Sequence, residues 1–190
     1  IVEDKVAGDF LKKIIKSKNI LNNINLVTDL AENDIGNTYT YLKKLLKKGT
    51  FLLDDSIILF DADVDISDIT TKSVPYLKFY DKDGYPIEKR IVKWIYDLDG
   101  SHVFFKNVSK EKASFIADFS SVHLTFLDDD TKIKHWDIKA FKKWAENNTV
   151  LFKKCITQYV AFENESFKNF RTEIIDAINL KRREKSLKDL

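Results

Sequence analysis

Methionine is absent from this sequence, and cysteine, proline and glycine are scarce, with one, two and five residues among 190. The single cysteine, Cys155, excludes an internal disulfide bond and fits a reducing compartment, so we expect a cytoplasmic protein. No apolar run approaches the roughly 20 residues that a membrane-spanning helix needs, and no signal peptide is present, so no membrane partner is expected. Because the chain starts at Ile1 without a methionine, we also expect it to be a piece of a longer protein.

Neither sign of charge dominates the chain. Lysine and arginine number 32 and aspartate and glutamate 30, which gives a net charge of +2 at pH 7. This balance is too even to indicate a nucleic-acid-binding protein from charge alone. Hydrophobic residues make up 44% and charged residues 33%, a profile typical of a soluble globular protein. The length suits one domain with a sizeable core, or one domain with a helical appendix.

The most informative stretch is an apolar run that ends in two acidic residues. Residues 56–60 have the composition of a buried strand, and Asp61 and Asp63 follow with one residue between them. A parallel strand ends at the edge of the sheet where ligands bind, so both carboxylates can point into one crevice. Hard oxygen ligands of this kind suit Mg²⁺ or Mn²⁺. A plain solvated turn is the alternative interpretation of the same pattern.

A strand end and a helix open the chain. Ile1-Val2 resembles the last step of a strand, and Glu3 separates it from a helix whose apolar residues recur at helical spacing over 6–15. Glu3 is therefore expected in the same crevice as Asp61, where a helix N-terminus also favours negative charge. A simple helix-capping role is the alternative.

A second strand–helix unit separates these two stretches. It comprises a strand over 24–28, a turn that contains Gly36, and an amphipathic helix over 41–48 with lysines on its outer face. Gly49 is expected to end this helix. The order β-α-β-α-β predicts an α/β fold in which helices flank a parallel sheet.

The order of these residues resembles a family. The segment Ile1-Val2-Glu3-Asp4-Lys5, a glycine-bearing turn, and an apolar strand that runs into Asp61 and Asp63 look like a Toprim domain. The nearest likeness is to the OLD-family (overcoming lysogenisation defect) ATPase-linked endonucleases, and it covers residues 1–66. The resemblance implies that Glu3, Asp61 and Asp63 bind Mg²⁺ or Mn²⁺ and hydrolyse phosphodiester bonds in DNA. It also implies an ATPase domain upstream and a role in anti-phage defence.

Downstream of the acidic pair the resemblance fades. Asp65 and Asp68 extend the acidic run, either as supports for the metal ligands or as surface residues. Three β-prone runs follow at 76–80, 91–96 and 103–105, separated by Asp-x-Asp-Gly turns, and they predict an antiparallel β-hairpin insertion over about 70–108.

The remainder of the chain is expected to be mostly helical. A short helix is expected over 110–119 and a strand over 122–127, and from residue 137 onward the pattern is helical. We therefore divide the chain into a Toprim-like catalytic domain over 1–135, with its first strand truncated, and a C-terminal helical segment over 136–190.

Basic residues near the end of the chain are candidate DNA contacts. Lys181, Arg182 and Arg183 could meet DNA phosphates, although a solvated helix end is the default interpretation. Family nucleases also use a lysine downstream of the acidic pair, and the resemblance leaves Lys168 and Lys106 as candidates for that role. The histidines His102, His123 and His135 lack ligand spacing and are not expected to bind metal.

Three other hypotheses remain open. A winged-helix DNA-binding protein would use residues 26–60 as helix, turn, helix and a two-stranded wing, with 41–49 as the recognition helix. A sugar-nucleotide transferase would use Asp61 and Asp63 for its metal. A Toprim-shaped module without catalysis would only assemble with partners, including copies of itself.

Overall fold

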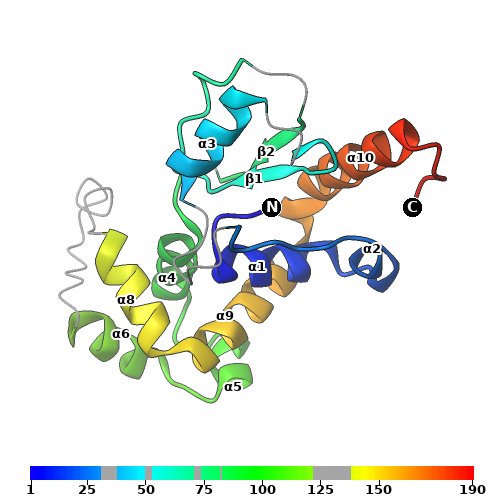
Figure 1. Ribbon diagram of the computed structural model, residues 1–190. Helices are drawn as coiled ribbons and strands as arrows, with labels where there is room; N and C mark the ends of the chain where they lie inside the picture. Colours follow the sequence, from blue (N-terminus) through cyan, green and yellow to red (C-terminus); the bar gives the residue numbers. More distant parts are fainter. Residues whose placement is uncertain (31–37, 50–52, 71–73, 82, 122–137) are drawn as a thin grey trace. The chain divides into compact units, whose positions relative to one another are not determined.

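The computed structural model describes residues 1–30, 38–49, 53–70, 74–81, 83–121 and 138–190. The chain forms two compact units, which we call the first unit (1–84 with 163–190) and the second unit (85–162). The elements of the first unit are α1 (Lys5–Ile15), α2 (Lys18–Asn22), α3 (Tyr39–Lys48), β1 (Ile58–Phe60), β2 (Tyr76–Lys78), η2 (Asn164–Phe167) and α10 (Lys168–Glu184) (Figure 1). The elements of the second unit are α4 (Ile87–Asp97), α5 (Val103–Val108), α6 (Lys112–Ser121), α8 (Ile138–Asn147) and α9 (Thr149–Phe162).

A small parallel sheet organises the first unit. β1 pairs with β2 in parallel register, with Leu59 opposite Leu77, and Val2 forms an isolated parallel bridge to Leu59 on the other side. The expected parallel arrangement of an α/β fold is therefore confirmed, although the chain is mostly helical. Parallel strands need a connection of a dozen or more residues, which the stretch from the end of β1 to the start of β2 supplies.

Helices cover both faces of this sheet (Figure 1). On one face, Ile58 and Phe60 of β1 pack with Leu42 and Leu46 of α3 in a buried cluster. On the other face, α1 and α10 lie against the sheet, and Phe10 of α1 is fully buried. Alternate residues of a strand point to opposite faces, so the continuously apolar β1 is what a two-sided core requires.

Side chains cap the N-termini of both α1 and α3. Asp4 caps α1 by accepting a hydrogen bond from the Ala7 N–H at 2.9 Å, and Thr38 caps α3 in the same way through the Tyr41 N–H at 3.3 Å. α3 ends at Gly49, whose φ of 59° lies in the left-handed region that glycine adopts without strain.

Two expectations for the first unit need correction. Residues 24–28 form no strand, although the Val2 N–H donates to the Val27 carbonyl at 3.0 Å, so this segment runs beside the edge of the sheet without extending its ladder. Residues 76–78 do form a strand, but it pairs in parallel with β1 and not in a hairpin with 91–96. The turn expected at Gly36 lies outside the described residues.

The predicted β-hairpin insertion is wrong, because helices occupy its place. Residues 91–96 belong to α4, and residues 103–105 open α5. The helix expected over 110–119 is confirmed as α6, and the chain from residue 138 onward is helical as predicted. The strand expected over 122–127 lies outside the described residues.

Aromatic side chains form the core of the second unit. Trp144 of α8 contacts Phe119 of α6 and Phe152 of α9 with ring centroids 5.0 and 5.8 Å apart. Trp94 of α4 lies edge-on to Phe104 at 5.1 Å. Tilted and edge-to-face pairs at these distances add to the stabilisation from buried area. None of the helices in the described ranges is both long and apolar enough to cross a membrane.

Cys155 packs in α9 and is expected to be chemically inert in the folded protein. Its side chain is fully buried, and this burial raises the pKa of the thiol to about 12. Because only the thiolate is a good nucleophile, iodoacetamide at pH 8 should alkylate native Cys155 at least about 100-fold more slowly than in the denatured chain. Mass spectrometry of timed aliquots gives both rates. Equal rates would contradict the burial of this thiol.

Candidate functional site

Three acidic residues predicted from the sequence lie at or near the carboxyl end of β1. Asp61 follows β1 directly and is buried, with 5% of its surface exposed, while Asp63 lies in the next turn and is exposed. The Val64 N–H donates to the Asp61 carbonyl at 3.2 Å and closes this turn. Burying a carboxylate is unfavourable unless hydrogen bonds or a cation compensate for the lost water. The burial of Asp61 therefore makes it a stronger candidate for a functional role than the exposed Asp63.

Glu3 reaches the same edge of the sheet. Val2 pairs with Leu59, which places Glu3 beside the end of β1, and the Glu3 Oε1 accepts a hydrogen bond from the Asp61 N–H at 2.9 Å. The expected convergence of Glu3 on Asp61 is therefore present. The helix-capping role that was the alternative for Glu3 belongs to its neighbour Asp4.

Further acidic residues line a cavity at this edge, which we call the carboxyl-edge cavity. It has a volume of about 970 Å³ and includes Ala62, the residue between the two predicted aspartates. Asp81 and Asp83 enter it after β2, and Glu165 and Glu173 enter it from η2 and α10. Its lining residues are Ala62, Lys78, Phe79, Tyr80, Asp81, Asp83, Gly84, Glu165, Ser166, Asn169, Phe170 and Glu173.

Sequence reasoning missed these four cavity residues. Asp81 comes three residues after the end of β2, so a strand followed by an acidic residue was a signal for it, but the Asp-x-Asp-Gly pattern predicts a hairpin turn at this place. The turn itself is present, since Gly84 has a φ of 68° and its N–H donates to the Asp81 carbonyl at 3.2 Å. Glu165 and Glu173 carry no local signal, because only the packing of α10 against the sheet brings them to this edge.

The acidic residues at this edge do not form a complete metal-binding site. Among the residues that the structure describes, no group of three histidine, cysteine, aspartate or glutamate side chains has the arrangement to hold a metal ion. The donor chemistry fits a hard divalent cation, because carboxylates are ligands of that kind, and the Glu3 carboxylate contacts the backbone of Asp61 while Asp63 is exposed in the following turn.

The candidate basic residues occupy opposite ends of α10. Lys168 is the first residue of the helix and lies between Ser166 and Asn169, both of which line the carboxyl-edge cavity. Lys181, Arg182 and Arg183 lie in the last turns, and 13 residues of helix place them roughly 20 Å from Lys168. Lys106, the other lysine candidate, lies in α5 of the second unit.

The basic residues at the end of α10 already have partners within the chain. Lys181 forms an ion pair with Glu184 at 2.8 Å, and Arg183 pairs with Asp189. The Arg182 Nε donates to the Lys188 carbonyl at 2.7 Å. The Arg183–Asp189 pair is exposed, and pairs of that kind are weak and exchange readily, so Arg183 stays able to meet a phosphate. The Lys181 side chain is only 13% exposed.

Asp65 and Asp68 hold α3 against the segment that follows β1. The Lys43 Nζ contacts the Asp65 carbonyl at 2.6 Å and the Asp68 carboxylate at 2.7 Å, and Lys47 pairs with Asp68 at 2.8 Å. From the sequence, Asp65 and Asp68 were either supports for the metal ligands or surface residues, and the contacts seen are those of surface residues.

The same contacts bear on the winged-helix hypothesis, because they occupy two lysines of the helix that this hypothesis uses to recognise DNA. The parallel pairing of β1 and β2 does not form that hypothesis's two-stranded wing.

Asp68 is expected to titrate well below an ordinary aspartate. Hydrogen bonds from Lys43 and Lys47 lower its pKa from 3.8 to about 2. Because the pKa is lower in the folded state, the stabilisation from this carboxylate is full above pH 3.8 and is lost as the pH falls toward 2. A carboxyl-resolved NMR titration measures the shift, and the Lys43→Gln variant should move the pKa back toward 3.8. An unshifted pKa in the parent protein would contradict these contacts.

Comparisons of the chain with protein-family models, with curated proteins and with solved structures found no match.

Proposed function

We propose that this chain is the catalytic module of a metal-dependent DNA endonuclease with a Toprim-like arrangement of its acidic residues. The observation that carries the proposal is the hydrogen bond between Glu3 and the Asp61 N–H, which brings two acids 58 positions apart to one edge of a parallel sheet. The carboxyl edge of such a sheet is where ligands bind in α/β proteins.

The charge at this edge supports a requirement for metal. The carboxyl-edge cavity collects Asp81, Asp83, Glu165 and Glu173 beside the turn that holds Asp61. An uncompensated phosphate would be repelled by such a group of carboxylates. A divalent cation removes this repulsion and provides the attraction that a phosphodiester substrate needs.

Each predicted residue has a role in this proposal. Glu3, Asp61 and Asp63 would hold Mg²⁺ or Mn²⁺, which when bound supplies an activated water and stabilises the charge on the leaving oxygen. The Glu3 carboxylate, by accepting the Asp61 N–H, fixes the turn that presents Asp61 and Asp63. Lys168, at the start of α10, would place a positive charge beside the phosphate.

The far end of α10 would contact DNA away from the reacting bond. Lys181, Arg182 and Arg183 lie roughly 20 Å along the helix from Lys168, a distance that corresponds to about six base pairs of B-form DNA. These residues would therefore bind backbone phosphates on one side of the cleavage position and contribute affinity without taking part in hydrolysis.

The proposal also includes partners. A module of this kind would work beside an ATPase domain or subunit encoded upstream, in the cytoplasm, and as a homo-oligomer that presents two sites to the two strands. We include in the proposal that such a nuclease acts in anti-phage defence.

A plasmid-nicking assay tests the proposal. Supercoiled plasmid should be converted to the nicked form when Mg²⁺ or Mn²⁺ is present, and an excess of chelator should stop the reaction. Ca²⁺ in place of Mg²⁺ or Mn²⁺ serves as a control, because it should allow the protein to bind DNA without efficient nicking. DNA binding that needs no metal and produces no nicks would overturn the proposal, and so would Mn²⁺-dependent binding of a uridine diphosphate sugar in place of nicking.

A further inference from the structure

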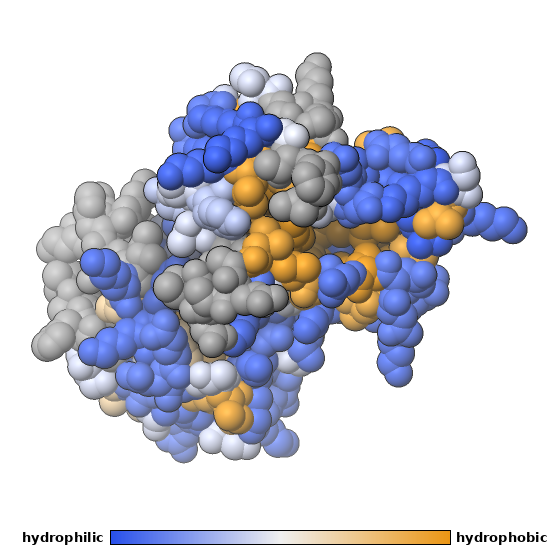
Figure 2. Space-filling view, viewed as in Figure 1, coloured by the Kyte–Doolittle hydropathy of each residue, from blue (hydrophilic) through white to orange (hydrophobic). Residues whose placement is uncertain are grey.

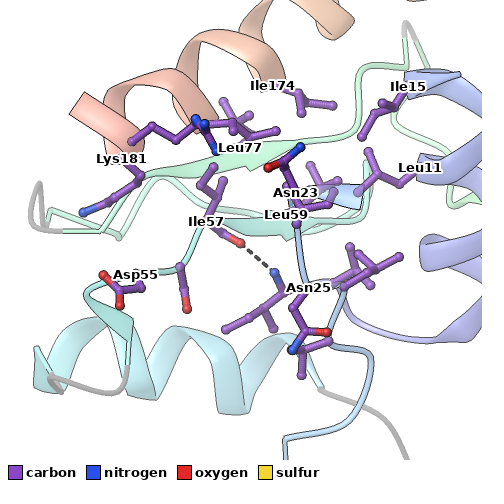
Figure 3. Close-up of a pocket in the computed structure, with 18 of the residues that line it drawn as sticks. Leu11, Ile15, Asn23, Asn25, Asp55, Ile57, Leu59, Leu77, Ile174 and Lys181 are labelled. Carbon is purple, nitrogen blue, oxygen red and sulfur yellow. Dashed lines mark hydrogen bonds between the residues drawn. The ribbon is translucent and has the colours of Figure 1, made fainter. Parts of the chain in front are cut away.

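A second cavity of the first unit lies near the start of β1, on the face of the sheet that α1 and α10 cover (Figure 3). Its volume is about 410 Å³, within the size range of pockets that hold small molecules. Leu59 and Leu77 of the sheet line it, together with Leu11 and Ile15 of α1. None of the described residues that line it is aromatic, so the interior suits a flexible aliphatic group.

The charged residues of this cavity lie at one end of it. Figure 3 shows Asp55 and Lys181 on the side away from the aliphatic residues of α1. Along α10 the change follows a single helix face, because Ile174, Ile178 and Arg182 recur every four residues and all three line the cavity. The distance from Ile174 to Arg182 along the helix is about 12 Å. The cavity is therefore amphipathic, aliphatic at one end and basic at the other.

Arg182 supplies the positive charge of the basic end that a ligand can use. The other two cations of the lining, Lys181 and Lys185, each form an ion pair with an acid of the chain. Arg182 donates from its Nε to the Lys188 carbonyl at 2.7 Å, and its two Nη groups make no hydrogen bond to the described residues. A guanidinium fork of this kind holds a carboxylate through two parallel hydrogen bonds.

The size of the cavity sets the size of its ligand. At about 30 Å³ for a group as large as a water molecule, the cavity holds about a dozen such groups. A carboxylate with an alkyl chain of about ten carbons has this volume, and when extended it is about as long as the helix from Ile174 to Arg182.

The surroundings of the cavity favour an alkyl chain over water. Figure 2 shows hydrophobic residues gathered in the middle of the first unit, between the hydrophilic outer face of α3 and the hydrophilic last turns of α10. Water in contact with aliphatic surface is unfavourable, so an alkyl chain that replaces this water is held by the hydrophobic effect.

We propose that this cavity binds a medium-chain aliphatic carboxylate, with its alkyl chain between the sheet, α1 and α10 and its carboxylate on the Arg182 guanidinium. The volume, the aliphatic lining and the position of Arg182 at one end support this ligand. Asp55 in the same lining disfavours a head group with two negative charges, so a carboxylate suits the site better than a phosphate monoester. The inference goes beyond the proposed endonuclease and does not depend on its metal chemistry.

Calorimetric titration with alkanoates of increasing length tests the aliphatic end. Each methylene group that enters an apolar site contributes a similar free energy, so the Kd should fall about tenfold from octanoate to decanoate. It should level off beyond about twelve carbons, when the cavity is full. Arg182 is also assigned to DNA phosphates above, so these titrations contain neither DNA nor metal.

The head group is tested with two ligands and two variants. Decanol, which has the chain of decanoate without the charge, should bind at least about tenfold more weakly. Arg182→Gln should weaken decanoate at least about tenfold and leave decanol unchanged, a difference that general unfolding would not produce. The matched control is Arg183→Gln, because Arg183 is adjacent and exposed but does not line the cavity, and this variant should bind decanoate like the parent.

A third variant tests the place of binding. Leu77 is a half-buried residue that lines the cavity, so Leu77→Phe should partly fill it and weaken decanoate and decanol alike.

Three results would overturn the inference. The first is an affinity that does not depend on chain length, and the second is equal binding of decanoate by the parent and Arg182→Gln. The third is a dimer in sedimentation velocity that decanoate does not dissociate, which would assign the cavity to a second copy of the chain. Plasmid nicking is measured without alkanoate, so this inference and the endonuclease proposal can fail independently.

Discussion

Replacing Asp61 with asparagine is expected to lower the rate of metal-dependent plasmid nicking at least about 100-fold. Asparagine has nearly the shape of aspartate, so the turn after β1 and the Glu3 hydrogen bond to the backbone N–H of residue 61 should persist. What the substitution removes is the negative charge of a side chain that is only 5% exposed. A carboxylate ligand lost from a metal site weakens both the binding of the ion and the chemistry that depends on it.

The measurement separates these two effects. Initial nicking rates over a range of Mn²⁺ concentrations show whether high metal restores activity, and calorimetric titration gives the metal affinity directly. The matched control is Asp65→Asn, which removes an acid from the same run. The Asp65 carboxylate is exposed and accepts hydrogen bonds from Ser67, including one from its N–H at 2.9 Å. This control should nick like the parent protein. An Asp61→Asn variant with unchanged activity and metal affinity would end the endonuclease proposal.

The successful sequence predictions rest on signals that are local and redundant. α3 combines apolar residues at helical spacing with a glycine stop at Gly49, and both signals indicate a helix that ends at Lys48. The approach of Glu3 to Asp61 was predictable because it needs only two strand ends and a parallel sheet. In both cases each signal agrees with the others, which is the condition under which a sequence specifies its structure.

The failure at residues 91–96 has a different cause. Isoleucine, valine, tryptophan and tyrosine favour strands, and a six-residue window fits either period. The buried positions Ile87, Ile91 and Ile95 recur every four residues, so a window that begins at Pro86 would have indicated a helix. Packing of α4 against other helices of the second unit then outweighs the intrinsic preference of its residues.

The acidic lining of the carboxyl-edge cavity shows where sequence reasoning stops. Asp81 and Asp83 come to this edge because β2 pairs with β1 in parallel, and the strand was assigned the wrong partner. Glu165 and Glu173 come from η2 and α10, about 100 residues downstream of Asp61, and only long-range packing brings them to this edge. No motif spacing contains that information.

Replacing Phe10 with alanine is expected to destabilise the first unit by about 3–5 kcal/mol. Phe10 is fully buried, and its ring centroid lies 5.4 Å from that of Phe79 and 5.6 Å from that of Phe167. Phe79 in turn contacts Phe170 at 5.4 Å, so this cluster joins α1, the end of β2 and the start of α10. The cavity left by alanine would loosen the contacts that bring Glu3, Asp81 and Glu173 to one edge.

The reporter for this prediction is built into the sequence, because Trp94 and Trp144 both belong to the second unit. Urea unfolding followed by far-ultraviolet circular dichroism should show an early transition in Phe10→Ala, while the tryptophan fluorescence transition stays near that of the parent. Phe115→Ala is the matched control, since Phe115 is fully buried beside Trp144 and should shift the fluorescence transition instead. If both variants shift both signals together, the two units unfold as one cooperative body, and the predicted separation of the two transitions is wrong. If they shift separately, Phe10→Ala loosens the first unit alone, and the nicking rate of this variant then reports how far the reaction depends on the packing that gathers the acids at that edge.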